Sequence, residues 1–314
     1  MTVHVADASQ NPVVASRILD DPEGEAMRIR EEQKMLCRRH NSQIQQDSRR
    51  NPDVYPYPGQ LDWDSEDIPP VAHPGITDFM EIAVQDIRPL INWTYFFQCW
   101  KTPSGTPAGQ RLLREADEIL DSMVSLRMGM KGRVLLTGAY SEGESIITEE
   151  GSVIPTPRQS PGRGRRRLLS LSDFIAPRGY DDHLGVFMVT MGDRLRSSVQ
   201  ELTDEYRSLL FRSVCDRLAE AASEWLHREV RTKVWGYAPD EDLSPKDLRR
   251  GKYRGIRPAV GYPSIPDQRL MHTLADMIRA EELGVDVTFN GALSPASSIA
   301  GFYFASARAK YFTL

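Results

Sequence analysis

The sequence predicts an α+β fold built around a mainly antiparallel, twisted sheet with helices on its faces. Short apolar, β-branched segments occur in small groups along the chain. Two long segments between them carry apolar residues at every third or fourth position, which indicates helices. No internal repeat is present, so a solenoid or propeller is not expected. Groups of strands separated by helices are typical of an α+β domain.

The first 60 residues differ from the rest of the chain. Residues 22–46 contain helix formers but little apolar periodicity, which predicts a solvated helix or a linker. Residues 51–75 are rich in Pro, Asp and Tyr, as expected of an extended connector. We therefore place a linker with a helical extension at 1–60 and one domain at 61–314.

The predicted domain begins with a dense aromatic block at residues 86–100. Residues 109–128 carry their apolar side chains on one stripe, which predicts an amphipathic helix. Two strands are predicted at 133–140 and 145–149. Residues 151–167, rich in Pro, Gly and Arg, predict a surface loop.

The second half begins with an apolar run at 185–190, which predicts a strand. The helical pattern at 193–235 exceeds the usual length of a globular helix, so we expect one break in it. A further helix is predicted at 267–283. Three closing strands are predicted at 285–289, 299–305 and 310–313.

Composition limits the possible functions. The chain has 40% hydrophobic and 26% charged residues and a net charge of −5, which argues against a nucleic-acid-binding protein with a wholly basic surface. Cys37, Cys99 and Cys215 give neither a disulfide framework nor a zinc spacing, which favours reduced thiols in the cytoplasm. No apolar run approaches the ~18 residues of a membrane span. The N-terminus lacks the pattern of a signal peptide.

The most informative segment is residues 252–267, KYRGIRPAVGYPSIPD. Pro258 fixes its own φ and favours an extended Arg257. Gly261 permits a close approach of the backbone to a ligand. A guanidinium suits a carboxylate because it can donate two parallel hydrogen bonds. These residues alone are compatible with two interpretations, an anion-binding loop and a structural turn with a surface arginine.

The string RPAVGYPSIP resembles the S-adenosylmethionine (AdoMet) motif of the activation domain of cobalamin-dependent methionine synthase. Other segments resemble the same family in the same order: LINWTYFFQCW, RLLREADEILDSM, LSDFIAP, DDHLGVFMVT, DRLAEAASEWLHREVRTKVWGYAPDEDLS and SIAGFYFASARAKYF. Matches to the family run in the same order from about residue 65 to residue 314. VADASQNPVVASRIL resembles the end of the preceding cobalamin-binding domain. The resemblance implies a single C-shaped domain.

The resemblance also implies a set of cofactor-binding residues: Asn92, Glu220, Arg257, Ala259, Gly261, Tyr262, Tyr311 and Phe312. In this set Arg257 is expected to hold the AdoMet carboxylate, and Ala259 to offer backbone contacts. Glu220 is expected near the amino-acid or sulfonium end, where a carboxylate favours a cation. Tyr262 is expected at the catalytic position, near the methyl group and the corrin. Tyr311 and Phe312 match an aromatic pair that contacts the ligand.

The chain departs from the family at three places. Asn92 replaces the usual Asp, and Gly251 replaces a Glu six residues before Arg257. Both changes remove a negative charge from the expected ligand site. The sequence also ends soon after Phe312, so a C-terminal helix of the family is expected to be missing.

The function implied is to bind AdoMet and present it to cob(II)alamin for reductive methylation, which reactivates methionine synthase. A flavodoxin-like or diflavin partner would supply the electron. The corrinoid motif D-x-H-x-x-G is matched only imperfectly at residues 181–185, so His183 is expected to be an ordinary residue where a strand begins. Cobalamin is therefore expected on a neighbouring domain of the same enzyme. No metal site is expected in this chain, nor any nucleic-acid or membrane partner.

Three alternatives remain. An interaction module could dock on a corrinoid protein or a reductase without productive AdoMet binding, which Asn92 and Gly251 would favour. Nucleic-acid binding would use a basic cluster, Arg163, Arg165, Arg166 and Arg167, and would require steep salt dependence. An independent small-molecule methyltransferase is less well supported, because the usual Gly-rich nucleotide loop is absent from the sequence.

Overall fold

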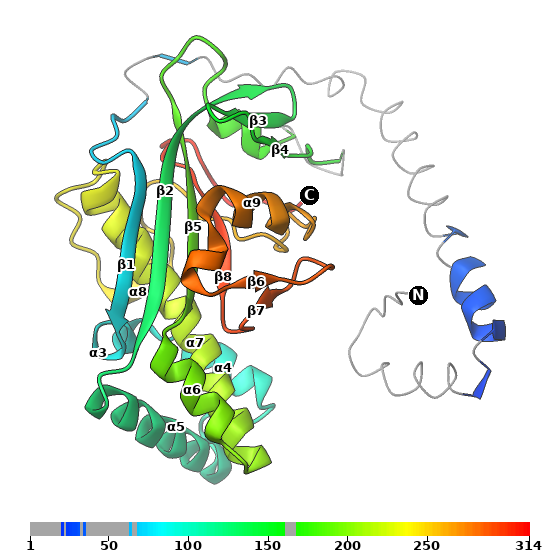
Figure 1. Cartoon of the computed structure of the whole chain (residues 1–314), viewed down its shortest axis with the longest axis vertical. Helices are drawn as coiled ribbons and strands as arrows, with labels where there is room; N and C mark the ends of the chain where they lie inside the picture. The colour runs from blue at the N-terminus through cyan, green and yellow to red at the C-terminus, as the bar shows by residue number, and fades with distance from the viewer. Residues whose placement is uncertain (1–19, 22, 32–33, 36–62, 65–67, 161–167) are drawn as a thin grey trace. The chain divides into compact units, whose positions relative to one another are not determined.

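The computed structural model describes residues 20–21, 23–31, 34–35, 63–64, 68–160 and 168–314 (Figure 1). The chain divides into two compact units, one of residues 1–59 with 160–168 and one of residues 60–159 with 169–314. In the first unit residues 23–31 form a helix, within the segment expected to contain one. Residues 22, 32–33 and 36–46 of that segment, which include Cys37, and the four arginines of the basic cluster lie outside the described residues.

The second unit is organised around the long strand β2 (Gly129–Glu142). One side of β2 pairs with β1 (Gly75–Ala83), and the other side pairs with β5 (His183–Met191). Three further strands complete this sheet: β3 (Ser145–Thr148) at the far end of β2, β4 (Val153–Pro155) beside β3, and β8 (Ile299–Tyr303) beside β5. The strands β6 (Asp286–Val287) and β7 (Leu293–Ser294) form a separate small sheet. Each of these pairings is antiparallel, as the sequence predicts.

Helices pack on both faces of the sheet (Figure 1). The α-helices are α3 (Val84–Ile87), α4 (Trp93–Cys99), α5 (Pro107–Ser125), α6 (Asp193–Glu201), α7 (Glu205–Glu229), α8 (Pro245–Arg249) and α9 (Leu270–Ile278). Short 3-10 helices lie at Arg88–Leu90, Leu171–Phe174 and Ala280–Leu283, and a π-helical turn at Val230–Val234 follows α7.

Strand β5 shows how the two faces are filled. Phe187 and Val189 lie in one core cluster with α5 and α7, whereas Val186 and Met188 lie in a second cluster with α9. Because neighbouring residues of a strand point to opposite faces, a strand covered on both sides needs apolar residues throughout. The unbroken apolar run at 185–190 is therefore explained.

Several predicted elements are confirmed. The helix at 109–128 is α5, which begins where Thr106 Oγ1 accepts a hydrogen bond from Gly109 N at 3.1 Å. The break expected within 193–235 lies between α6 and α7, where the Asp204 carboxylate caps α7. The strand at 299–305 is β8.

Other predictions are wrong. Residues 310–313 form no strand, because they run as coil with Phe312 packed against the core. The helix predicted at 267–283 is interrupted at Arg279, whose φ of 53° is left-handed. Part of the loop expected at 151–167 pairs as β4. Strand β1 was not predicted, although its sequence, GITDFMEIA, has a partly alternating pattern.

Among the helices of the described residues, none is both long enough and apolar enough to cross a lipid bilayer.

Candidate functional site

The loop that contains Arg257 continues the sheet beyond β8. Ile256 and Phe304 exchange two backbone hydrogen bonds at 3.0 Å, and Phe302 N donates to Pro258 O at 3.0 Å. Ile256 and Val260 point into the core, so Arg257, next to Ile256 on this extended stretch, faces the opposite side. The stiff extended loop expected from Pro258 is thereby held along the edge of the sheet.

Gly255 permits this close approach. Its φ is +83°, and an added Cβ would lie 2.4 Å from Phe304 O. A side chain at this position would therefore clash with the strand that holds the loop.

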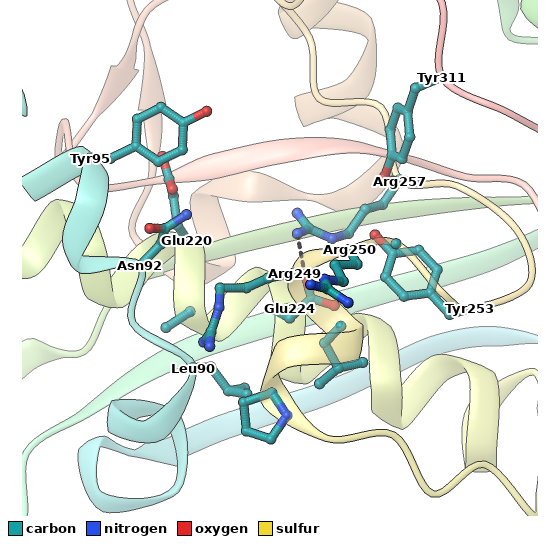
Figure 2. Close-up of a pocket in the computed structure, with 14 residues that line it drawn as sticks. Leu90, Asn92, Tyr95, Glu220, Glu224, Arg249, Arg250, Tyr253, Arg257 and Tyr311 are labelled. Atoms are coloured by element: carbon teal, nitrogen blue, oxygen red, sulfur yellow. Dashed lines mark hydrogen bonds and ion pairs between the residues drawn. The ribbon is translucent and has the colours of Figure 1, made fainter.

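Helix α7 supplies the carboxylates that face the loop. Glu220 and Glu224 are four residues apart, so they lie on the same side of the helix. Arg257 Nη2 donates to Glu224 Oε2 at 2.6 Å (Figure 2). Arg217 Nη1 lies 3.2 Å from Glu220 Oε2. Both carboxylates are therefore already paired with arginines.

The Arg257 guanidinium keeps donors for a further partner. The backbone N of Arg257 donates to Tyr311 Oη at 3.0 Å, which fixes the base of the Arg257 side chain. Burial is the largest single effect and tends to lower the pKa of Arg257, but Glu224, Tyr253 and Tyr311 together outweigh it. The pKa is therefore raised, and the group stays cationic. Nε is fully buried without a partner among the described residues, and Nη2 is engaged by Glu224. This leaves Nη1, which has no partner among the described residues and is not fully buried, as the nitrogen that can donate to a ligand.

Two adjoining cavities open beside Arg257, of about 400 and 640 Å³. Both share Tyr95, Glu220, Arg257 and Tyr311. The first cavity is also lined by residues of α7, α8 and the loop after α8: Ala221, Glu224, Pro245, Leu248, Arg249, Arg250, Gly251 and Tyr253, with Leu90 and Asn92 opposite (Figure 2). The second is lined by Cys99, Arg217, Pro258, Ala259, Tyr262, Pro263, Ser264, Ile299, Phe312 and Thr313. Each lies in the size range of small-molecule sites, ~300–1,000 Å³.

Comparison with known proteins identifies the family. Residues 83–314 match the family model described as the activation domain of vitamin B12 dependent methionine synthase. The chain belongs to this family. A solved structure described as the MetH reactivation domain bound to AdoHcy is 31% identical, with a TM-score of 0.74, over 81% of this chain and 86% of that one.

The activation domain brings the predicted site residues together, with one exception. Asn92, Glu220, Arg257 and Tyr311 line the first cavity, and Ala259, Tyr262 and Phe312 line the second. Gly261 lines neither cavity, but its φ of +90° makes the turn that places Tyr262. Asn92 Oδ1 accepts from Thr94 N at 3.1 Å, so this oxygen caps α4.

Tyr262 is a partly exposed residue that lines the second cavity. It is 54% exposed, so its phenol is accessible to a docking partner. Partial burial and the nearby charge of Glu220 raise the pKa of Tyr262, which keeps the phenol protonated at neutral pH.

The lining residues of the activation domain that were not predicted from the sequence include Tyr95, Glu224, Arg249, Arg250 and Tyr253. Glu224 could have been found, because it lies one helical turn after Glu220 within the predicted helix. The sequence around Arg249 and Arg250 does not indicate a binding site, because a basic pair at a helix end is common on solvated surfaces.

A buried aromatic layer lies beneath the site. His227 is fully buried and stacks on Tyr303 at 4.9 Å between ring centroids, with Tyr253 edge-on at 4.9 Å. Arg231 is buried nearby, bound through two nitrogens to Glu241 and lying over the Tyr253 ring. This packed layer fixes Tyr253, which forms part of the cavity wall.

Within the described ranges, no three His, Cys, Asp or Glu side chains are grouped so that they could hold a metal ion. His183 is the first residue of β5, as expected of a residue that begins a strand.

Proposed function

We propose that this domain binds AdoMet in the two adjoining cavities and presents it to cob(II)alamin for reductive methylation, which reactivates methionine synthase. The observation that carries the proposal is the open donor of Arg257 next to the carboxylate of Glu220 in a cavity of suitable size. The similar reactivation domain bound to AdoHcy supports it, because AdoHcy is AdoMet without the transferred methyl group.

The cavities divide the ligand between them in this proposal. The first takes the amino-acid end, where Arg257 meets the carboxylate and Glu220 favours the cationic ammonium or sulfonium. The second takes the adenosyl end, against Ala259, Tyr262 and the aromatic ring of Phe312. Tyr262 then lies where the ligand meets solvent and where the methyl group would leave.

Methyl transfer from a sulfonium is an in-line displacement, in which the carbon–sulfur bond breaks and its electron pair stays on sulfur. This step needs positioning and no general acid or base. The open cavities leave room for the acceptor to approach. We propose that a neighbouring domain of the same enzyme holds the cobalamin and that a flavodoxin-like or diflavin protein supplies the electron. Since Cys99 and Cys215 are both free, a reducing cytoplasmic setting fits the proposal.

Calorimetric titration with AdoMet tests the proposal. Arg257→Ala should weaken binding by ~2–4 kcal/mol, or roughly 30- to 1000-fold, because a charge-assisted contact to the carboxylate is lost. Arg269→Ala is the matched control, since Arg269 is exposed, pairs with Asp267 and lines neither cavity. Unchanged affinity in Arg257→Ala would contradict the proposal.

The alternative is an interaction module that docks on a corrinoid protein or a reductase without productive AdoMet binding. It is favoured by Asn92, whose Oδ1 is occupied by helix capping, and by Gly251, which offers no side chain. A thermal unfolding assay separates the two, since AdoMet at 100 times its Kd should add ~2.7 kcal/mol of stability to a binding domain. An interaction module would show no such shift at any AdoMet concentration.

A further inference from the structure

Arg249 and Arg250 line the first cavity without a partner of their own. They end α8 and begin the turn at Gly251, and both are exposed (Figure 2). Neither guanidinium has a hydrogen bond or an ion pair within the described part of the chain. Two uncommitted cations therefore border the cavity into which Arg257 points.

The carboxylates of this cavity are already engaged. Glu224 pairs with Arg257, and its second oxygen Oε1 is fully buried without a partner. Glu220 pairs with Arg217, which lies outside the first cavity. The lining residues thus hold three guanidinium groups against two carboxylates, so the potential in the cavity favours an anion.

A ligand carboxylate needs more donors than Arg257 has free. One of its terminal nitrogens is bound to Glu224, and Nε has no exposed surface. Nη1 can donate a hydrogen bond to one carboxylate oxygen, but Arg257 is poorly placed to donate the usual two parallel hydrogen bonds to both oxygens. A second guanidinium close by can supply the missing donor.

We propose that Arg249 and Arg250 are specificity-determining residues that bind the α-carboxylate of AdoMet together with Arg257. Recognition then depends strongly on the carboxylate and only weakly on the α-amino group, for which Glu220 is the accessible carboxylate of the first cavity. This inference rests on the proposed function, and it assigns the ligand chemistry of the amino-acid end. Because the two arginines are exposed, their contribution is screened and should weaken with added salt.

The experiment compares the affinities of two ligands for the unaltered chain and for one double variant. AdoMet and decarboxylated AdoMet are titrated by calorimetry into the full chain and into the Arg249→Gln/Arg250→Gln double variant. The double variant should bind AdoMet about 10-fold more weakly than the unaltered chain and decarboxylated AdoMet equally well, because the two arginines contact only the carboxylate. An AdoMet analogue without the α-amino group should bind the unaltered chain within about 5-fold of AdoMet.

The control is Lys246→Gln, which removes a positive charge from the same helix but from a residue that does not line the cavity. It should leave both affinities unchanged. Equal losses for both ligands in the double variant would overturn the inference, as would an unchanged affinity for AdoMet, while leaving the proposed function in place. Failure of the unaltered chain to bind AdoMet would overturn both.

Discussion

Arg257 and Glu224 form an ion pair where the first cavity meets the core, with Nη2 and Oε2 2.6 Å apart. Glu224 is 11% exposed at its side chain and Arg257 23%, so each charge is mostly withdrawn from water. A mostly buried pair of this kind is costly to break, because removing one partner leaves the other charge uncompensated.

Glu224→Ala should therefore lower the free energy of unfolding by about 3 kcal/mol, measured by urea denaturation. The double variant Glu224→Ala/Arg257→Met should be destabilised less than the single one, since it leaves no unpaired cation. Arg269→Ala, which breaks only an exposed pair with Asp267, should not move the midpoint. A double variant less stable than Glu224→Ala would show that the pair is not coupled.

Gly301 on β8 packs directly against the backbone of the loop that contains Arg257. An added Cβ would lie 2.3 Å from Pro258 O and 2.7 Å from Ala259 Cα, both backbone atoms. Gly301→Ala should push the loop outward, lower the free energy of unfolding by ~1–3 kcal/mol and weaken AdoMet binding measured by calorimetry. Gly105→Ala, where the new methyl group meets open space, should change neither. Normal affinity in Gly301→Ala would mean that the loop tolerates displacement.

His227 gives the domain a dependence of stability on pH. Burial lowers the pKa of His227 well below its ordinary value of 6.5, and the charges of Arg231 and Arg257 lower it further. Below pH 6.5 the unfolded chain therefore binds a proton that the folded chain does not. The free energy of unfolding should fall as the pH drops, by up to ~1.4 kcal/mol per pH unit for this one group.

Urea denaturation at several pH values between 4.5 and 7.5 tests this (about two pH units below and one above the ordinary pKa of histidine). His227→Phe should show a shallower slope than the unaltered chain, whatever its absolute stability. His272→Gln, on the exposed side of α9, should keep the original slope. Identical slopes in His227→Phe and the unaltered chain would mean that His227 is protonated equally in both states.

The backbone of the loop around Arg257 is easier to predict from the sequence than its surroundings. The motif around Arg257 could be recognised because prolines and glycines restrict the backbone locally, so its geometry depends little on tertiary contacts. The apolar pattern of residues 310–313 predicts a strand, but the tertiary packing of Phe312 decides their conformation. Arg249 and Arg250 could not be predicted, because only the packing of α8 beside α7 brings them to the cavity.

Cys99 offers a direct test of where the ligand lies. It is exposed on α4 and lines the second cavity with Tyr262 and Phe312, whereas Cys215 is buried and burial raises its pKa, which makes that thiol unreactive. In a Cys37→Ser background, iodoacetamide should therefore modify Cys99. AdoMet at 10 times its Kd should slow this reaction about 10-fold, because about nine-tenths of the sites are then covered.

The same protection should disappear in Arg257→Ala at equal AdoMet concentration, since the ligand no longer binds. Mass spectrometry of the alkylated chain measures both rates and verifies that Cys215 stays unmodified. If calorimetry shows AdoMet bound while Cys99 reacts at its original rate, the adenosyl end does not occupy the second cavity. The ligand would then lie along α8 instead, and the division of AdoMet between the two cavities would be wrong.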